Sequence, residues 1–137
     1  YEEMVEQIMR QLAEFGHKNG IGERVAQGGV QMLSTSGTVT TLAAIHLDLP
    51  RYDRARIDGL RLEVETLMRA TRHIRGMRAS ERFLHPCIGA DRSDYILSGC
   101  ALFEAVARLW PVGRITVADR GVREGIVLSL MAEQGLI

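Results

Sequence analysis

The first apolar pattern along the chain is a three- and four-residue repeat within residues 2–18. The repeat consists of Val5, Ile8, Leu12 and Phe15. Such spacing forms one apolar face of an amphipathic helix, with the glutamates outside it. Asn19-Gly20 and Gly22 follow, and these residue types are typical of a helix end. The pattern therefore predicts a helix over about residues 2–18.

Two later segments each combine a short strand with a following helix. Val30–Leu33 begins with a β-branched residue and predicts a strand, and Val39–Leu47 predicts a buried helix rich in small residues. Arg114–Ala118 alternates polar and apolar residues, which predicts a second strand. Val122–Glu133 repeats apolar residues at helical spacing. Each strand is thus expected to lead through a polar loop into a helix.

The chain between these two units is expected to be mainly helical. Asp53 is expected to cap a helical turn, and a brief extended piece is expected near 57–60. The longest helix should contain Gly99, where the missing side chain permits a close approach of another element. The expected helices are 54–57, 62–74, one turn capped by Ser80 that ends before His85-Pro86, and 91–109.

Length and composition narrow the fold class and the partners. The 137 residues fit one domain or one complete subdomain of a larger protein, and the start within a helical pattern without Met is typical of a fragment. Seventeen acidic and seventeen basic residues exclude a global electrostatic drive toward nucleic acid or membranes. No stretch is long enough to span a bilayer. Cys87 and Cys100 are expected to be reduced and buried, as in a cytosolic protein.

The first strand-to-helix junction is a run of hydroxyl residues with one glycine. It reads Ser34, Thr35, Ser36, Gly37 and Thr38. A helix N-terminus presents unpaired N–H groups and a partial positive charge, which attract phosphate oxygens. Gly37 would let the backbone approach such a ligand. The alternative is that Ser36 or Thr38 only caps the helix, and the residues alone do not separate the two interpretations.

The second junction, Asp119–Gly125, also follows a strand and opens a helix. Asp119 stands where a cap or a ligand-facing carboxylate would lie. Arg123 could hold a phosphate in a bidentate manner, or it could pair with Glu124 or Asp119. An ion-paired, capped turn therefore remains the structural alternative to a phosphate site.

Other charged residues give weaker indications. The four histidines show no metal-binding spacing, so no metal site is expected from them. Arg69, Arg72, Arg75, Arg78 and Arg82 form a basic edge at helical spacing. Such an edge is typically a solvated face, and the alternative is a groove that follows a polyanionic substrate.

Several separated pieces resemble one family in the same order. The pieces are Ser34–Thr38 with the helix start Val39–Ala43, Arg92-Ser93-Asp94 leading to Gly99, Val117–Gly125, Tyr52-Asp53, and Ser80-Glu81-Arg82. Through them the chain resembles the exopolyphosphatase/guanosine pentaphosphate phosphohydrolase family, which belongs to the actin-like ATPase superfamily. The resemblance spans roughly residues 28–131.

The resemblance implies a two-lobed hydrolase with a ribonuclease-H-like fold in each lobe. This chain, residues 1–137, would be most of the second lobe, an α/β fold that is predominantly helical with a small sheet of two or three strands. The implied phosphate- or nucleotide-binding residues are Ser34, Thr35, Ser36, Gly37, Thr38, Asp119, Gly121, Arg123 and Glu124. Ser34 and Arg120 depart from the family pattern, in which a glycine and a small residue are typical.

The family's catalytic glutamate and its D-x-G-G-G-S phosphate loop lie upstream of the matched region. The resemblance therefore assigns no catalytic residue and no metal ligand to this chain, although Mg²⁺ is expected for the full-length enzyme. Its substrate would be polyphosphate or a guanosine nucleotide, pppGpp, in the cytoplasm, with no membrane and no nucleic acid as partner. The alternative is a non-catalytic polyphosphate- or nucleotide-binding and dimerisation module. A homodimer is expected because a sheet edge and the cleft face would be exposed.

Overall fold

A three-stranded mixed sheet organises the chain. The computed structural model describes residues 1–137, and the strand order is β1 (Met32–Ser34), β3 (Arg114–Val117), β2 (Leu60–Glu63). β1 runs parallel to β3, with Met32 opposite Ile115 and Ser34 opposite Val117. β2 pairs with the other side of β3 in the antiparallel sense. A parallel pair needs a long crossover connection, and most of the helices lie within it.

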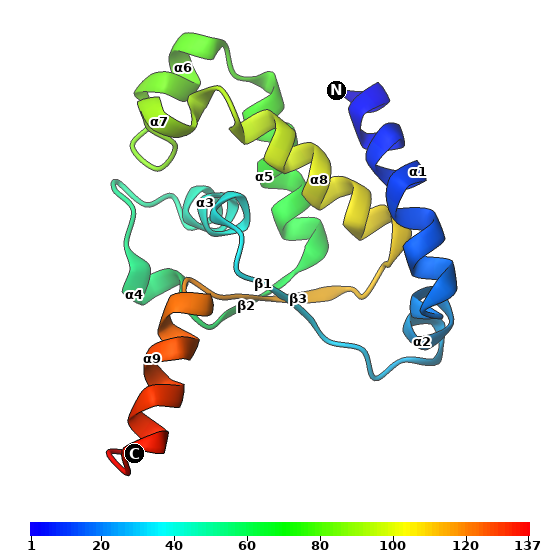
Figure 1. Cartoon of the computed structure of the whole chain (residues 1–137). Coiled ribbons are helices and arrows are strands. Elements are labelled where there is room, and N and C mark those ends of the chain that lie inside the picture. The colour runs from blue at the N-terminus through cyan, green and yellow to red at the C-terminus, as the bar shows by residue number, and fades with distance from the viewer.

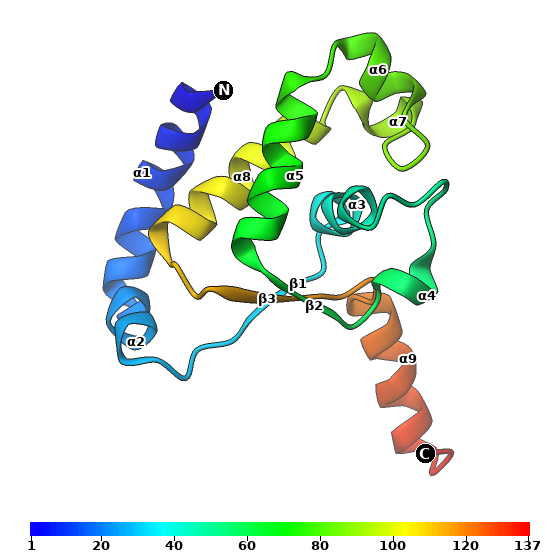
Figure 2. The same cartoon turned by 180° about the vertical axis from the view of Figure 1, so that it is seen from behind.

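Three helices cover one face of the sheet. They are α3 (Gly37–His46), α5 (Val64–Gly76) and α8 (Ile96–Leu109), seen on the same side in Figures 1 and 2. α1 (Glu2–Lys18) packs beside α8. The other helices are α2 (Ile21–Gln27), α4 (Arg54–Ile57), α6 (Ala79–Leu84), α7 (Ala90–Ser93) and α9 (Val122–Glu133). The predicted class, mainly helical with a small sheet, is confirmed.

The core lies between the sheet and these three helices. Its fully buried side chains include Leu42, Leu67, Ile74, Ile115 and Val117. Burial of each such leucine, isoleucine or valine contributes about 1.5–3 kcal/mol. Cys87 and Cys100 are buried and free, as expected, and burial raises the pKa of the Cys100 thiol to about 11.

A buried carboxylate joins α1 to α8 and α5. Glu104 of α8 is only 3% exposed, and it accepts a 2.9 Å hydrogen bond from the Tyr1 hydroxyl. Arg108 pairs with the same carboxylate, and the Arg75 guanidinium lies 3.8 Å from it and stacks on the Tyr1 ring. A buried charge is costly unless it is paired and hydrogen-bonded, so these partners make the position of Glu104 tolerable.

The boundaries of three predicted helices are confirmed. α1 covers residues 2–18, α4 covers 54–57 and α9 begins at Val122 and ends at Glu133. The predicted cap of α4 is also confirmed, because an Asp53 carboxylate oxygen accepts a 3.0 Å hydrogen bond from the Ala55 amide.

The predicted position of the strand near the middle of the chain was wrong. Residues 60–63 form β2, whereas the extended piece was expected earlier, near 57–60, with a helix starting at Leu62. Leu60 and Leu62 alternate with exposed Arg61 and Glu63, so one side of the strand faces the core. Pairing with β3 keeps these residues extended, and α5 starts only at Val64.

Two further helical predictions were also wrong, and one helix was missed. The helix expected over 91–109 is broken at Asp94-Tyr95 into α7 and α8, so α1 with 17 residues is the longest helix. α2 was not predicted, because its glycines resembled a helix end. Ser80 lies inside α6 rather than at its cap. The Glu81 carboxylate instead accepts a 2.6 Å hydrogen bond from the Arg78 amide.

The opposite side of the sheet carries no helix layer. Leu33 on β1 is 63% exposed, and α9 extends away from the sheet toward the C-terminus (Figure 1). Most of the apolar side chains of α9 are exposed, and Met131 is half-buried. The exposed ones are Val122, Ile126, Val127, Leu128 and Leu130.

Gly99 confirms the predicted close approach between elements. A Cβ atom at this position of α8 would lie 2.0 Å from the Thr38 hydroxyl oxygen of α3. The contact fixes the first turn of α3 against α8. Any side chain here must push the two helices apart or displace Thr38.

We therefore expect Gly99→Ala to lower the free energy of unfolding by about 1–3 kcal/mol, the usual cost of overpacking. Gly125→Ala is the matched control, because Gly125 lies in α9 with no atom within 4 Å of its Cβ position. That control should be neutral or stabilise by up to about 1 kcal/mol, since alanine favours helix over glycine. Chemical denaturation of both variants measures the difference, and equal stabilities would contradict the packing role of Gly99.

Candidate functional site

The first junction leaves the end of β1 and opens α3. Ser36 is the N-cap of α3, and its hydroxyl oxygen accepts a 3.2 Å hydrogen bond from the Thr38 amide. The Ser34 hydroxyl oxygen in turn accepts a 3.2 Å bond from the Ser36 amide. The capping interpretation is thus confirmed for Ser36. Thr35 and Gly37 are exposed, and their own amides make no hydrogen bond within the chain.

A shallow cavity of about 240 Å³ lies in front of this junction. Its lining residues are Ser36, Gly37, Thr38, Arg92, Tyr95 and Ile96. Arg92 Nη1 donates hydrogen bonds to the Gly37 carbonyl oxygen at 3.2 Å and to the Thr41 hydroxyl at 2.9 Å. The fold thereby places a guanidinium group beside the N-terminus of α3.

Arg92 is the residue that sequence reasoning missed at this site. The sequence places Arg92 in a family motif but does not link it to Gly37, because 55 positions separate the two residues in the chain. Its presence in that motif was the available signal. The packing of α7 and α8 beside α3 was needed to locate it.

The second junction leaves the end of β3 and opens α9. Glu124 Oε2 accepts a 2.8 Å hydrogen bond from the Gly121 amide and thus caps the helix. Its other oxygen accepts a 3.1 Å bond from Arg54 Nη2. The amides of Gly121 and of Glu124 itself, followed by Arg54, lower the pKa of the Glu124 carboxyl to about 2.

The ion-paired, capped turn is confirmed as the local structure, but its cation is not the one considered. Arg54 of α4 pairs with Glu124 and also places Nε 3.4 Å from Asp119 Oδ2. It further donates a hydrogen bond to the Asp119 carbonyl oxygen. The pairing of Arg123 with Glu124 or Asp119, which the sequence left open, does not form.

Asp58 holds the same loop from its other side. Asp58 Oδ1 accepts a 2.9 Å hydrogen bond from the Asp119 amide, and Oδ2 accepts a 2.7 Å bond from Arg120 Nε. The Asp119 amide is the main cause of a lowered pKa at Asp58, with Arg120 adding to it. Arg120 is therefore bound at the side of the loop by Asp58.

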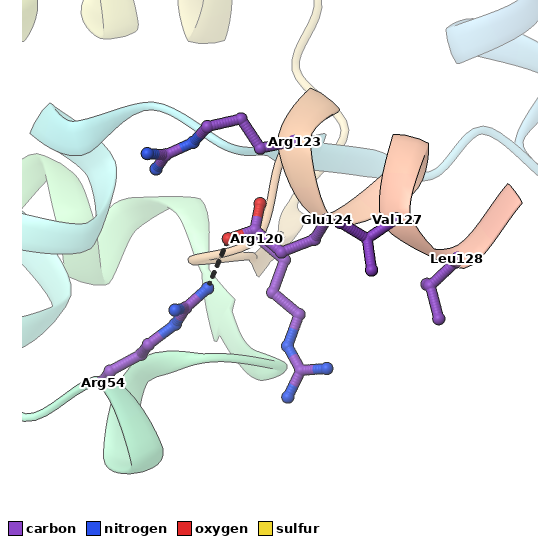
Figure 3. Close-up of a pocket in the computed structure, with 6 residues that line it drawn as sticks. All are labelled: Arg54, Arg120, Arg123, Glu124, Val127 and Leu128. Carbon is purple, nitrogen blue, oxygen red and sulfur yellow. Dashed lines mark hydrogen bonds and ion pairs between the residues drawn. The ribbon is translucent and has the colours of Figure 1, made fainter. Parts of the chain in front are cut away.

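Arg123 is the cation of this loop that makes no hydrogen bond or ion pair in the structure. It lines a cavity of about 490 Å³ with Arg54, Arg120, Glu124, Val127 and Leu128. Figure 3 shows that its side chain extends away from the Arg54–Glu124 pair and on a different side from Arg120. In this view it extends toward the ribbon that joins β1 to α3.

The parallel pairing of β1 and β3 brings the two predicted groups of residues together. The Ala118 amide donates a 2.9 Å hydrogen bond to the Ser34 carbonyl oxygen, so both loops leave the same sheet edge. Tyr52 lies between them. Its pKa is raised mainly by burial, with the Thr40 hydroxyl and the Asp119 carboxylate as neighbours. All nine predicted binding residues thus belong to one region of the molecule.

The basic edge on α5 and α6 is largely neutralised within the chain. Arg72 pairs with Glu65, Arg75 lies near Glu104, and Arg78 pairs with Glu81. Arg69 and Arg82 bond to neutral oxygens. This arrangement favours the solvated-face interpretation over a groove for a polyanion.

The chain offers no ready cage for a divalent ion. No three side chains of the His, Cys, Asp or Glu type come together in a way that could hold one. The two carboxylates of the second junction, Asp119 and Glu124, are both engaged by Arg54.

None of the helices is both long and apolar enough to cross a membrane.

Comparison with known protein families shows which family this chain belongs to. The Ppx/GppA phosphatase family matches residues 1–134. The chain belongs to this family. The similar protein "Exopolyphosphatase 2" of Mycobacterium tuberculosis, found in two strains, is 29% identical over 99 residues, which cover 69% of this chain and 31% of that protein. The chain therefore spans about a third of the length of these curated relatives.

Solved structures agree in fold. A Ppx/GppA family member from Aquifex aeolicus superposes with a TM-score of 0.74 at 22% identity, covering 98% of this chain and 42% of that one. The type II variant of the Aquifex aeolicus phosphatase gives 0.75 at 21%, covering 91% and 39%. An exopolyphosphatase-like protein gives 0.76 at 23%, covering 98% and 44%. The predicted actin-like, ribonuclease-H-like class is thereby confirmed.

The environment of Glu124 generates a titration prediction. Because its folded-state pKa lies below the ordinary value of 4.5, its stabilising contacts are present at neutral pH and are lost as the pH falls toward 2. Nuclear magnetic resonance of the side-chain carboxyl should show a midpoint near pH 2. Arg54→Gln should raise that midpoint, while the two backbone amides keep it below 4.5.

Glu65 provides the control for this titration. Its pKa is lowered mainly by Arg72, and both residues lie in α5 whereas Arg54 lies in α4, so Arg54→Gln should leave the pKa of Glu65 unchanged. An ordinary midpoint for Glu124 in the unaltered chain would contradict the described cap and ion pair.

Proposed function

We propose that this chain is the second lobe of a two-lobed phosphohydrolase that cleaves terminal phosphoanhydride bonds of inorganic polyphosphate or pppGpp. Its contribution is a pair of phosphate-binding loops, at Ser34–Thr38 and Asp119–Glu124. The observation that carries this proposal is their common origin at one edge of the parallel pair β1 and β3. Ligands of open α/β sheets bind outside the carboxyl ends of such strands.

The first loop has the chemistry of an anion site. The amides of Thr35 and Gly37 are exposed and unpaired at the N-terminus of α3, where the helix carries a partial positive charge. The Arg92 guanidinium lies at the same point. A phosphate oxygen would accept hydrogen bonds from these donors without displacing a protein acceptor at either amide.

The second loop supplies one further positive charge that has no internal partner. Arg123 is exposed and has no acidic partner, whereas Arg54 and Arg120 are each held by a carboxylate. A guanidinium with no internal partner can bind a phosphate without breaking an ion pair first. In the proposed role it neutralises charge on the terminal phosphates, which is the main requirement of phosphoryl transfer.

In this proposal, the residues that activate the attacking water lie in another part of the full-length enzyme. The family relationship makes Mg²⁺ the expected ion of the full-length enzyme, where it would neutralise phosphate oxygens. Asp119 and Glu124 fit that ion poorly while both are paired with Arg54. No residue of this chain is proposed as a catalytic acid or base. A cytoplasmic location is part of the same proposal.

A non-catalytic binding and dimerisation module is the second candidate. The observation that favours it is the exposed apolar surface of α9, where Ile126, Val127, Leu128 and Leu130 are each more than half exposed. Apolar patches of this kind mark contacts with another surface. Saturable polyphosphate binding without phosphate release, together with a homodimer in solution, would favour this candidate.

Phosphate release from long-chain polyphosphate and from pppGpp with Mg²⁺ tests the proposal. We expect release by the full-length parent protein and none by the 137-residue chain alone. No release by the parent, with tight binding retained, would support the module. Release by the chain alone would contradict the absence of catalytic groups and shift attention to Asp119 and Glu124.

Arg123→Ala tests the second loop. Loss of one charge-assisted hydrogen bond of about 1.5–3 kcal/mol should raise the polyphosphate Kd by roughly 10- to 150-fold. Arg24→Ala is the control, because Arg24 is an exposed arginine on α2 that also lacks an ion pair. Isothermal titration calorimetry measures both, and an unchanged Kd for Arg123→Ala would remove Arg123 from the site.

A further inference from the structure

The short connection between α3 and β2 reaches the second phosphate loop through a single arginine. Arg54 lies in the four-residue helix α4 and is separated from Glu124 by 70 positions in the chain. Its guanidinium contacts both carboxylates of the loop, with Nη2 3.1 Å from Glu124 and Nε 3.4 Å from Asp119. It also donates to the Asp119 carbonyl oxygen. One side chain therefore touches the loop at three points.

The charges around the loop show what this contact achieves. Three carboxylates and three guanidinium groups meet there, and they are Asp58, Asp119, Glu124, Arg54, Arg120 and Arg123. Asp58 is matched by Arg120, and Arg54 is shared by the other two acids. Without Arg54 the group would carry a net negative charge. Asp119 and Glu124 would then face any anion at the loop without compensation.

The hydrogen bonds of Glu124 also support a role for Arg54 in the loop. Glu124 holds the Gly121 amide with one oxygen and Arg54 with the other. Arg54 thus orients the carboxylate that caps α9. Arg123 precedes Glu124 in the same helical turn, and its side chain extends away from the Arg54–Glu124 pair (Figure 3).

A simple bracing role would give a different result. The Arg54 side chain is 51% exposed, and ion pairs at this exposure contribute little to stability because water screens them. The fold should therefore survive loss of Arg54. An anion at the loop would still lose the one positive charge that Asp119 and Glu124 share.

We propose that Arg54 is a positioning residue for phosphate binding: it pairs with Asp119 and Glu124, offsets one of their two negative charges and leaves Arg123 as the unpaired cation that faces the ligand. This inference rests on the proposed function of the two loops. It adds a residue from a third, separate segment to the site. Arg54 acts through the loop and need not touch phosphate itself.

The experiment measures binding of inorganic tripolyphosphate to the full-length protein at low ionic strength. Arg54→Met should raise the Kd about five- to tenfold, the effect expected for one unit charge near the ligand at an intermediate effective dielectric constant. Arg54→Lys keeps the charge and should lose less. Arg114→Met is the matched control, because Arg114 pairs with Glu63 at the opposite end of β3 and should leave the Kd unchanged.

A double variant separates the proposed role from bracing. Adding Glu124→Gln to Arg54→Met restores the net charge of the loop, and the amide oxygen can still accept from Gly121. We expect this pair of changes to recover most of the lost affinity, with similar thermal unfolding in all variants. Weak binding that Glu124→Gln does not restore would show a bracing role and overturn the proposal.

Two other results have distinct meanings. Unchanged affinity in Arg54→Met would overturn the role of Arg54 while the proposed phosphate site stands. No tripolyphosphate binding by the unaltered protein would overturn the phosphate site and the role of Arg54 together.

Discussion

Parallel pairing between β1 and β3 is the constraint on which the rest of the structure depends. Two parallel neighbours cannot be joined by a tight turn, so the chain between them must cross over one face of the sheet. α3, α5 and α8 form that crossing layer and bury the core (Figure 2). The same pairing brings the carboxyl ends of both strands to one edge. The Ser34 loop and the Asp119 loop therefore become neighbours although about 80 residues separate them.

Electrostatics then divide the residues of that edge into two groups. Most charged side chains are matched inside the chain, as Arg120 is by Asp58 and as Glu124 is by Arg54. The donors that remain are the amides of the first loop and the guanidinium of Arg123. Internal pairing of this kind leaves unpaired hydrogen-bond donors at this edge of a chain that has no net charge. Family membership supports the proposed use of that edge, since polyphosphate and pppGpp are polyanions.

Packing between the helices supports the first loop from behind. The absence of a side chain at Gly99 lets α8 approach Thr38 closely, and Arg92 in the preceding helix α7 lies next to Gly37. The buried Glu104 cluster holds α1 against α8 on the other side of that helix. The position of the first loop is therefore coupled to contacts far from the sheet edge.

Local pattern in the sequence determined α1, α4 and α9, the mainly helical class and the hydroxyl-rich loop, because periodicity and capping act over only a few residues. It also grouped Ser34–Thr38 with the second loop, through motifs that occur in a fixed order. Only the tertiary structure decided which residues form β2, because this depends on pairing with β3. It also decided the partner of Glu124, which is the distant Arg54. Such contacts join segments far apart in the chain. Their formation depends on packing, which no local pattern records.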